Sequence, residues 1–123
     1  MKTLGEFYRE YIVGRDDLET REFLEYNGEC EVVKDLFGWK LYSGKHSIDC
    51  RSREEAQFLK IFLDAGMHEV SVPADDNYLR QVLPELEHLK KRTDEIIGLY
   101  VDGVLNSKIK ESVRRKVYQE LIS

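Results

Sequence analysis

The first fifth of the chain shows apolar residues at helical spacing. The pattern from Leu4 to Ile12 predicts a helix, and Gly14 is suited to end it. A second helix is predicted next, with Asp16 or Asp17 as its N-cap and Asn27-Gly28 at its end. Its apolar positions are Leu18, Phe23, Leu24 and Tyr26. The alternative is one kinked helix over the same residues.

The middle of the chain has a different pattern. Residues 30–33 form a short β-branched run, and residues 37–42 and 46–50 alternate between apolar and polar. Ser43-Gly44-Lys45 separates the last two segments, so they predict a β-hairpin. The period of two places one set of side chains on the buried face and Lys40 and Tyr42 on the outward face. The set expected to be buried is Trp39, Leu41, Ile48 and Cys50.

A helix and a further strand are predicted after the hairpin. Ser52 and Glu55 are spaced as a capping box, and Ala65-Gly66 is suited to end the helix that follows. Residues 70–72 then read as a strand ended by Pro73. Strand, helix and strand in this order predict a right-handed crossover, with the new strand parallel to the second strand of the hairpin.

The last third of the chain is predicted to be helical. Asp75 or Asp76 caps a helix that Pro84 either kinks or replaces with a new helix. An apolar stripe continues from residue 86 to 104, and Asn106-Ser107 breaks it. A final amphipathic helix has its apolar stripe at Ile109, Val113, Val117 and Leu121. The chain thus predicts a single α+β domain over residues 1–123, with two N-terminal helices, about four strands and a helical C-terminal third.

Composition supports an ordinary globular domain. The chain has 123 residues, and a domain of this size folds without a metal or a disulfide. It contains neither an apolar run long enough to span a membrane nor the apolar core of a signal peptide, which predicts a cytoplasmic protein. In that compartment Cys30 and Cys50 are expected to be free thiols. The net charge is −5, but residues 34–60 carry +2 and residues 106–123 carry +3.

No pattern of residues announces a catalytic or metal site. The glycines do not form a phosphate loop, and the cysteines and histidines lack zinc-ligand spacing. Glu85 and His88 stand one helical turn apart, but this is only half of a di-iron motif. His46 and Cys50 share a face of one strand at a separation of about 13 Å, too far for a hydrogen bond. We therefore expect no cofactor and no metal.

Three functional hypotheses follow, in decreasing order of support. The first is a non-enzymatic binding or adaptor module that contacts a protein, or a second copy of itself, through the helical C-terminal third. Its contact residues are Ile109, Val113, Val117 and Leu121.

The second is a nucleic-acid-associated domain that uses a basic and aromatic hairpin face. That face consists of Lys40, Tyr42, Lys45, Arg51 and Arg53. Salt separates the first two hypotheses, because phosphate contacts weaken steeply as salt rises and apolar contacts do not. The third and weakest is a small enzyme built around Cys50 with His46 or His88.

Overall fold

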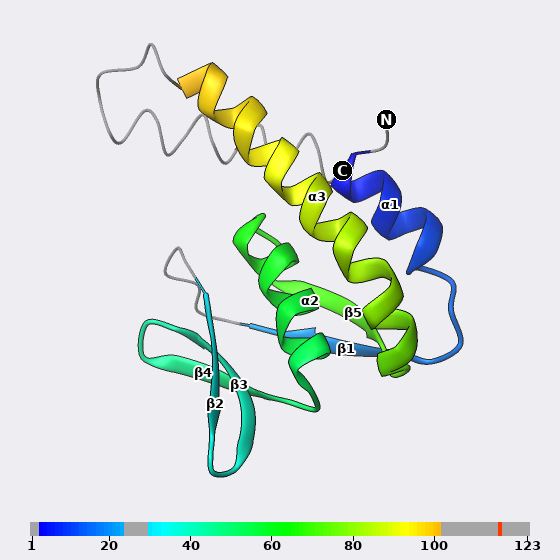
Figure 1. The fold of residues 1–123 in the computed structure, drawn as a ribbon, viewed down its shortest axis with the longest axis vertical. Helices are drawn as coiled ribbons and strands as arrows, with labels where there is room; N and C mark the ends of the chain where they lie inside the picture. The colour runs from blue at the N-terminus through cyan, green and yellow to red at the C-terminus, as the bar shows by residue number, and fades with distance from the viewer. Residues whose placement is uncertain (1–2, 24–29, 102–115, 117–123) are drawn as a thin grey trace.

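The structure is a computed structural model that describes residues 3–23, 30–101 and 116, with the side chains of 99–101 left aside. This part of the chain contains three helices and five strands (Figure 1), so the predicted α+β class is confirmed. In chain order they are α1 (Leu4–Tyr11), β1 (Leu18–Glu22), β2 (Glu31–Asp35), β3 (Gly38–Ser43), β4 (His46–Cys50), α2 (Arg53–Asp64), β5 (Glu69–Pro73) and α3 (Asp76–Val101).

The strands form two small antiparallel sheets instead of one. β1 pairs with β5 in a two-stranded sheet, in which Leu18 lies opposite Pro73. β3 is the central strand of a three-stranded sheet, between β2 and β4. The predicted hairpin is confirmed as β3–β4, with Ser43 opposite His46 next to its turn. The β2 strand was also expected, although its pairing with β3 was not.

The prediction of a second N-terminal helix is wrong, because Leu18–Glu22 is strand β1. The kinked-helix alternative fails for the same reason. The backbone of β1 pairs with β5, about fifty residues later, and the Phe23 N–H continues the contact by donating to the His68 carbonyl at 2.9 Å. A pairing between distant segments has therefore overridden the local apolar spacing.

The predicted parallel crossover is also wrong. Helix α2 does connect two strands, β4 and β5, but these strands belong to different sheets. β5 pairs antiparallel with β1. The contact between β1 and β4 is made by a side chain, because the Arg21 guanidinium of β1 donates a hydrogen bond to the Asp49 carbonyl of β4. The two sheets are therefore joined here by a side-chain contact, whereas the sequence predicted strands paired through the backbone in a single sheet.

Helix α2 begins as its sequence predicts. The Ser52 hydroxyl accepts a hydrogen bond from the Glu55 N–H at 3.2 Å. The Glu55 carboxylate reaches back and accepts from the Arg51 N–H at 3.1 Å. The Glu55 N–H, which is one of the free N–H groups of the first turn, and the N–H of the residue before the cap are thereby satisfied. At the other end Gly66 has a φ of +97°, a conformation that suits glycine.

Helix α3 begins at the predicted cap and continues through its proline. The Asp75 carboxylate accepts from the N–H groups of Asn77 and Tyr78, at 2.9 and 3.2 Å. Pro84 lies inside the helix, which runs on to Val101, so no new helix begins there. The predicted break at Asn106-Ser107 and the last helix lie outside the described residues.

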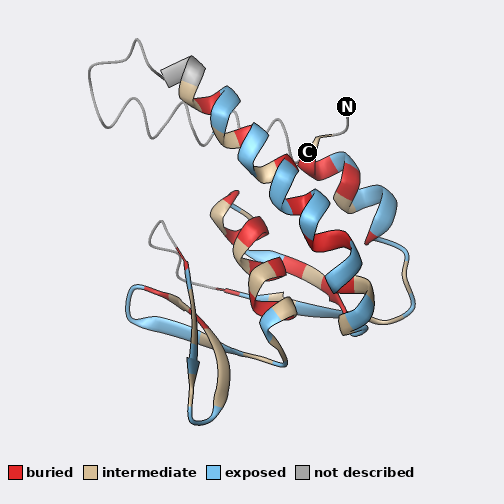
Figure 2. Cartoon of the chain, viewed as in Figure 1, coloured by how far each residue is buried: buried red, intermediate tan, exposed pale blue. Residues whose placement is uncertain are grey.

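Helix α2 is the centre of the hydrophobic core. It contacts α3, β5 and all three strands of the second sheet. Its Phe58 and Phe62 are fully buried with ring centroids 4.9 Å apart, and Tyr8 of α1 packs on Phe62 at 4.9 Å. Figure 2 shows the buried positions concentrated where α2, β5 and the first half of α3 meet. Neither α1, α2 nor α3 has the length and apolar character needed to cross a membrane.

Candidate functional site

The turn between β2 and β3 is fixed by its first and last residues. Asp35 pairs with Gly38 across the hairpin, so Leu36 and Phe37 are the two residues between them. The Phe37 N–H donates to the Asp35 carboxylate at 2.8 Å, and Gly38 takes a φ of +119°. That N–H, with the nearby Lys40 ammonium, lowers the pKa of Asp35. A type I turn prefers aspartate at its first position and glycine at its fourth, and it accepts most residues between them. The backbone conformation therefore does not require particular residue types at positions 36 and 37.

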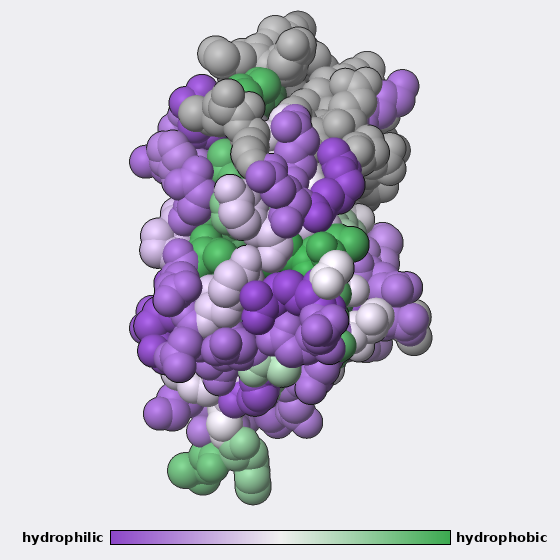
Figure 3. Space-filling model, turned by 90° about the vertical axis from the view of Figure 1, so that its right-hand side faces the viewer, coloured by the Kyte–Doolittle hydropathy of each residue, from purple (hydrophilic) through white to green (hydrophobic). Residues whose placement is uncertain are grey.

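These two unconstrained positions carry large apolar side chains. Leu36 is 98% exposed and Phe37 is 89% exposed. We call this pair the Leu36–Phe37 tip. Figure 3 shows an apolar projection at the end of the molecule where Figure 1 places the β2–β3 turn. Exposed apolar side chains at a turn contribute nothing to the core, and such surface commonly marks a site of interaction.

Two lysines lie against the aromatic rings near the tip. The Lys34 ammonium lies 5.6 Å from the centroid of the Trp39 ring, and the Lys40 ammonium lies 5.9 Å from that of Phe37. Lys40 also lies 3.4 Å from the Asp35 carboxylate, which raises the pKa of Lys40. Lys34 has no carboxylate partner among the described residues. The tip is thus an apolar surface next to an uncompensated positive charge.

The residues predicted for the nucleic-acid face are dispersed in the structure. Lys40 and Tyr42 point to the outward face of the sheet, and their cross-strand neighbours are Asp49 and Glu31. Lys40 lies within ion-pair distance of two carboxylates, 3.4 Å from Asp35 and 3.9 Å from Asp49. The outward face therefore carries three carboxylates and one ammonium group.

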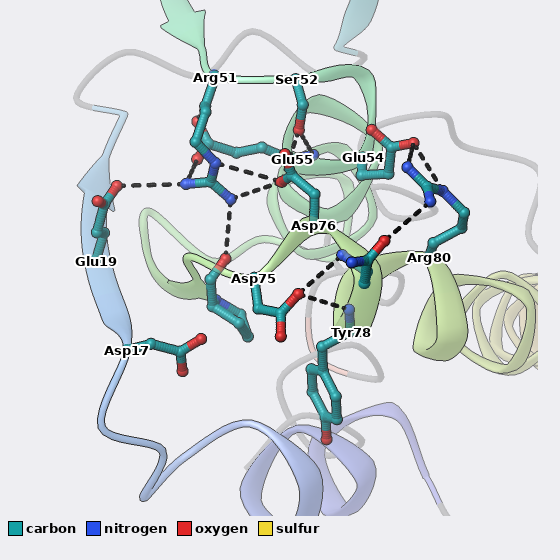
Figure 4. A network of polar contacts seen from close by, with 12 residues as sticks. Asp17, Glu19, Arg51, Ser52, Glu54, Glu55, Asp75, Asp76, Tyr78 and Arg80 are labelled. Carbon is teal, nitrogen blue, oxygen red and sulfur yellow. Dashed lines mark hydrogen bonds and ion pairs between the residues drawn. The ribbon is translucent and has the colours of Figure 1, made fainter.

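The remaining members of that set lie elsewhere. Lys45 is exposed in the β3–β4 turn, and Arg53 is the exposed first residue of α2. Arg51 lies in the loop between β4 and α2, and its guanidinium points into a network of carboxylates (Figure 4). The structure does not bring the five residues together into one basic surface.

The Arg51 network surrounds a carboxylate that is fully buried. Glu55 is 0% exposed, and its carboxylate lies 2.8 Å from an Arg51 guanidinium nitrogen and 3.9 Å from that of Arg21. The Arg51 guanidinium also donates to the Pro73 carbonyl at 3.0 Å and to the Asp76 carboxylate at 2.9 Å. A buried charge is tolerated only where it is paired and hydrogen-bonded in this way.

This network joins four elements, namely β1, α2, β5 and α3. Arg51 lies 3.6 Å from Glu19 of β1, and Asp76 at the start of α3 also accepts from the Ser52 hydroxyl at 3.0 Å. At the edge of the network, Arg80 of α3 lies 3.3 Å from Glu54 of α2. Figure 4 shows these side chains converging between β1, β5 and the first turns of α2 and α3. We interpret this network as structural, because its charged groups form hydrogen bonds and ion pairs with one another.

The cysteines and histidines do not assemble into a catalytic arrangement. Cys30 and Cys50 are both free, and burial raises their pKa values to about 12 and about 11. Both thiols are therefore protonated at neutral pH, which is the opposite of what a nucleophile needs. His46 is exposed beside the β3–β4 turn, and Glu85 and His88 are exposed on α3. In residues 3–23 and 30–101, no group of three or more metal-binding side chains occurs.

Sequence reasoning missed the tip. The alternating pattern predicts a strand at Phe37 and no role for Leu36. The signal was present: aspartate and glycine bracket two apolar residues, where polar residues are usual in a turn. The predicted contact residues of the last helix, Ile109, Val113, Val117 and Leu121, lie outside the described residues.

Comparisons with models of protein families, with curated proteins and with solved structures found no match for this chain.

Proposed function

We propose that this chain is a non-enzymatic binding module that recognises a protein partner by inserting the Leu36–Phe37 tip into an apolar pocket. The observation that carries the proposal is the exposure of both side chains, 98% and 89%, in a turn whose geometry depends on other residues. Folding gains nothing from leaving these side chains in water. A partner that buries them gains about 1.5–3 kcal/mol for each one.

The rigidity of the turn supports an anchoring role. The hydrogen bond from the Phe37 N–H to Asp35 and the ion pair between Asp35 and Lys40 hold the backbone at the tip. Less conformational freedom is therefore lost when the tip is bound. Protein interfaces commonly concentrate their binding energy in a few such apolar and aromatic residues. The last helix stays a predicted second contact surface.

The charges around the tip favour a protein partner over a nucleic acid. Phosphate contacts require cations that are free to approach the backbone. Lys40 is instead paired with Asp35 and Asp49, and Arg51 is engaged with Glu55 and Asp76. These pairings leave the nucleic-acid hypothesis with little free positive charge on the outward face.

Site-specific photocrosslinking tests the proposal. Phe37 is replaced by p-benzoyl-phenylalanine, and the same residue is placed at Lys45 as a control, since both positions are exposed in turns of the same sheet. After irradiation in the producing cell, we expect a discrete protein adduct from position 37 only. Adding Leu36→Ser to the position-37 variant is expected to reduce the adduct several-fold. Equal adducts from both positions, or none from position 37, would contradict the proposal.

A further inference from the structure

A cleft of about 810 Å³ lies at the other end of β2 from the tip. It is bounded by the beginning of β2, by α2 and by the middle of α3. Its apolar wall includes Val32 and Ile61. Lys60 of α2 donates to the Cys30 carbonyl at 2.6 Å, and Asp64 accepts from the Cys30 N–H at 3.1 Å. These two contacts hold Cys30, the residue before β2, against α2. This side of the cleft is therefore preformed, as binding pockets usually are.

The cleft carries an excess of negative charge. Lys60 pairs with Asp64 and Lys90 pairs with Asp94, each at 2.8 Å. Two further carboxylates of the lining, Glu31 and Glu87, are exposed and have no ion-pair partner in the part of the chain that the structure describes. With two ammonium groups and four carboxylates, the lining has a net charge of −2. A ligand suited to this cleft is apolar at its end and positively charged beside it.

The Leu36–Phe37 tip has the chemistry that the cleft requires. Its apolar pair is flanked by Lys34, whose ammonium group lies over Trp39 without a carboxylate partner in residues 3–23 and 30–101. The tip cannot enter the cleft of its own molecule. Val32 at the cleft and Leu36 at the tip are separated by about 13 Å of extended strand, because each residue of a strand advances about 3.3 Å. A contact between them is therefore intermolecular.

We infer that the tip of one copy of this chain binds in the cleft of a second copy, with Lys34 next to the unpaired carboxylates. The inference depends on the proposed function and names its partner. Since tip and cleft lie at the two ends of one strand, a two-fold axis near the middle of β2 allows both contacts to form at once in a closed dimer. Because the tip consists of two residues, we expect each contact to bury less than the roughly 800 Å² per partner of a standard interface, and the dimer to be weak.

A charge-reversal experiment on the full chain tests this inference. One variant carries Lys34→Glu at the tip, and the other carries Glu31→Lys with Glu87→Lys at the cleft. All three positions are exposed, so the fold is expected to tolerate the changes. Sedimentation velocity is measured up to about 0.5 mM protein, a range that detects dissociation constants in the micromolar range. We expect the wild-type chain to dimerise and each variant alone to dimerise at least about tenfold more weakly.

Mixing the two variants gives the decisive result. In the mixed dimer the reversed tip meets the reversed cleft, and the other contact has both native charges. We therefore expect dimerisation to return to the wild-type level in the mixture. Lys45→Glu and Glu85→Lys, exposed positions outside the tip and the cleft, are the matched controls and are expected to behave as wild type. Failure of the mixture to recover, with both variants weakened, overturns the pairing of tip and cleft.

The outcomes for the two proposals are distinguishable. A purified wild-type chain that stays monomeric overturns the self-association, as does association that neither charge reversal weakens. If position 37 nevertheless crosslinks to a different protein in the cell, the proposed binding function stands and only the identity of the partner is wrong. An adduct with twice the mass of the chain supports both.

Discussion

The two antiparallel sheets of this molecule differ in how completely they are covered. β5 of the two-stranded sheet contributes Val70 and Val72, both 0% exposed, and it contacts both α2 and α3. Of the three helices that the structure describes, only α2 covers the three-stranded sheet, and among the described apolar residues of this sheet only Leu41 is fully buried. Its far end carries the Leu36–Phe37 tip beyond the core. One sheet holds the fold together, and the other displays a surface.

The largest expected effect comes from making the same substitution in both regions. Phe62→Ala removes a fully buried ring that packs on Phe58 and Tyr8, and we expect it to lower the free energy of unfolding by about 3–5 kcal/mol. Phe37→Ala removes a ring that is 89% exposed and is expected to change it by less than about 0.5 kcal/mol. Urea denaturation of both variants measures the difference. A comparable loss at position 37 would show that the tip belongs to the core.

The next effect concerns the buried carboxylate of the covered region. Arg51→Ala leaves Glu55 buried with only the more distant Arg21 opposite, and we expect a loss of about 3 kcal/mol in unfolding free energy. Arg80→Ala removes a guanidinium that is 64% exposed from its pair with Glu54, so its expected loss is at most about 1 kcal/mol. Chemical denaturation at neutral pH compares the two. Equal losses would mean that the Arg51 network is no more important than a surface ion pair.

The smallest expected effect is a dependence on acid. Burial alone raises the pKa of Asp76, but the hydrogen bonds from Arg51 and Ser52 outweigh it, and the pKa of Asp76 lies below its ordinary value. A carboxylate with a lowered pKa in the folded state stabilises the fold above its unfolded pKa of about 3.9 and loses that contribution as the pH falls further.

We therefore expect stability to decline below about pH 4, and to decline less steeply in Asp76→Asn, which lacks the titrating group. Thermal unfolding between pH 2 and pH 7 measures both slopes. Asp49→Asn, at a side chain that is 88% exposed, is the control and should retain the wild-type slope. A wild-type slope in Asp76→Asn would exclude this carboxylate as a source of the acid sensitivity.

Local signals in the sequence were sufficient for several elements. The capping box at Ser52, the aspartate before α3 and the turn between β3 and β4 each depend on residues within a few positions of one another. Such interactions form with little help from the rest of the chain, so their residue types predict the structure directly.

Contacts between distant segments were not predictable in this way. Leu18–Glu22 is a strand because β5 pairs with it, and nothing within the segment identifies that partner. Arg51 seemed suited to bind phosphate because the sequence does not show that Glu55, Asp76 and Glu19 surround it. The Leu36–Phe37 tip was not predicted for a different reason. Its turn signature is local, but the exposure of its side chains is evident only in the structure, where the three-stranded sheet extends beyond α2.

The division of labour within the β2–β3 turn has a consequence for how this chain changes during evolution. Asp35 and Gly38 set the backbone, and under the proposed function the two residues between them set what the turn binds. Substitutions at the exposed positions 36 and 37 would then alter specificity while leaving the folded scaffold intact. Under the proposed function, recognition and stability are encoded in different residues, so changes in two codons would be enough to acquire a new partner without a compensating change in the core.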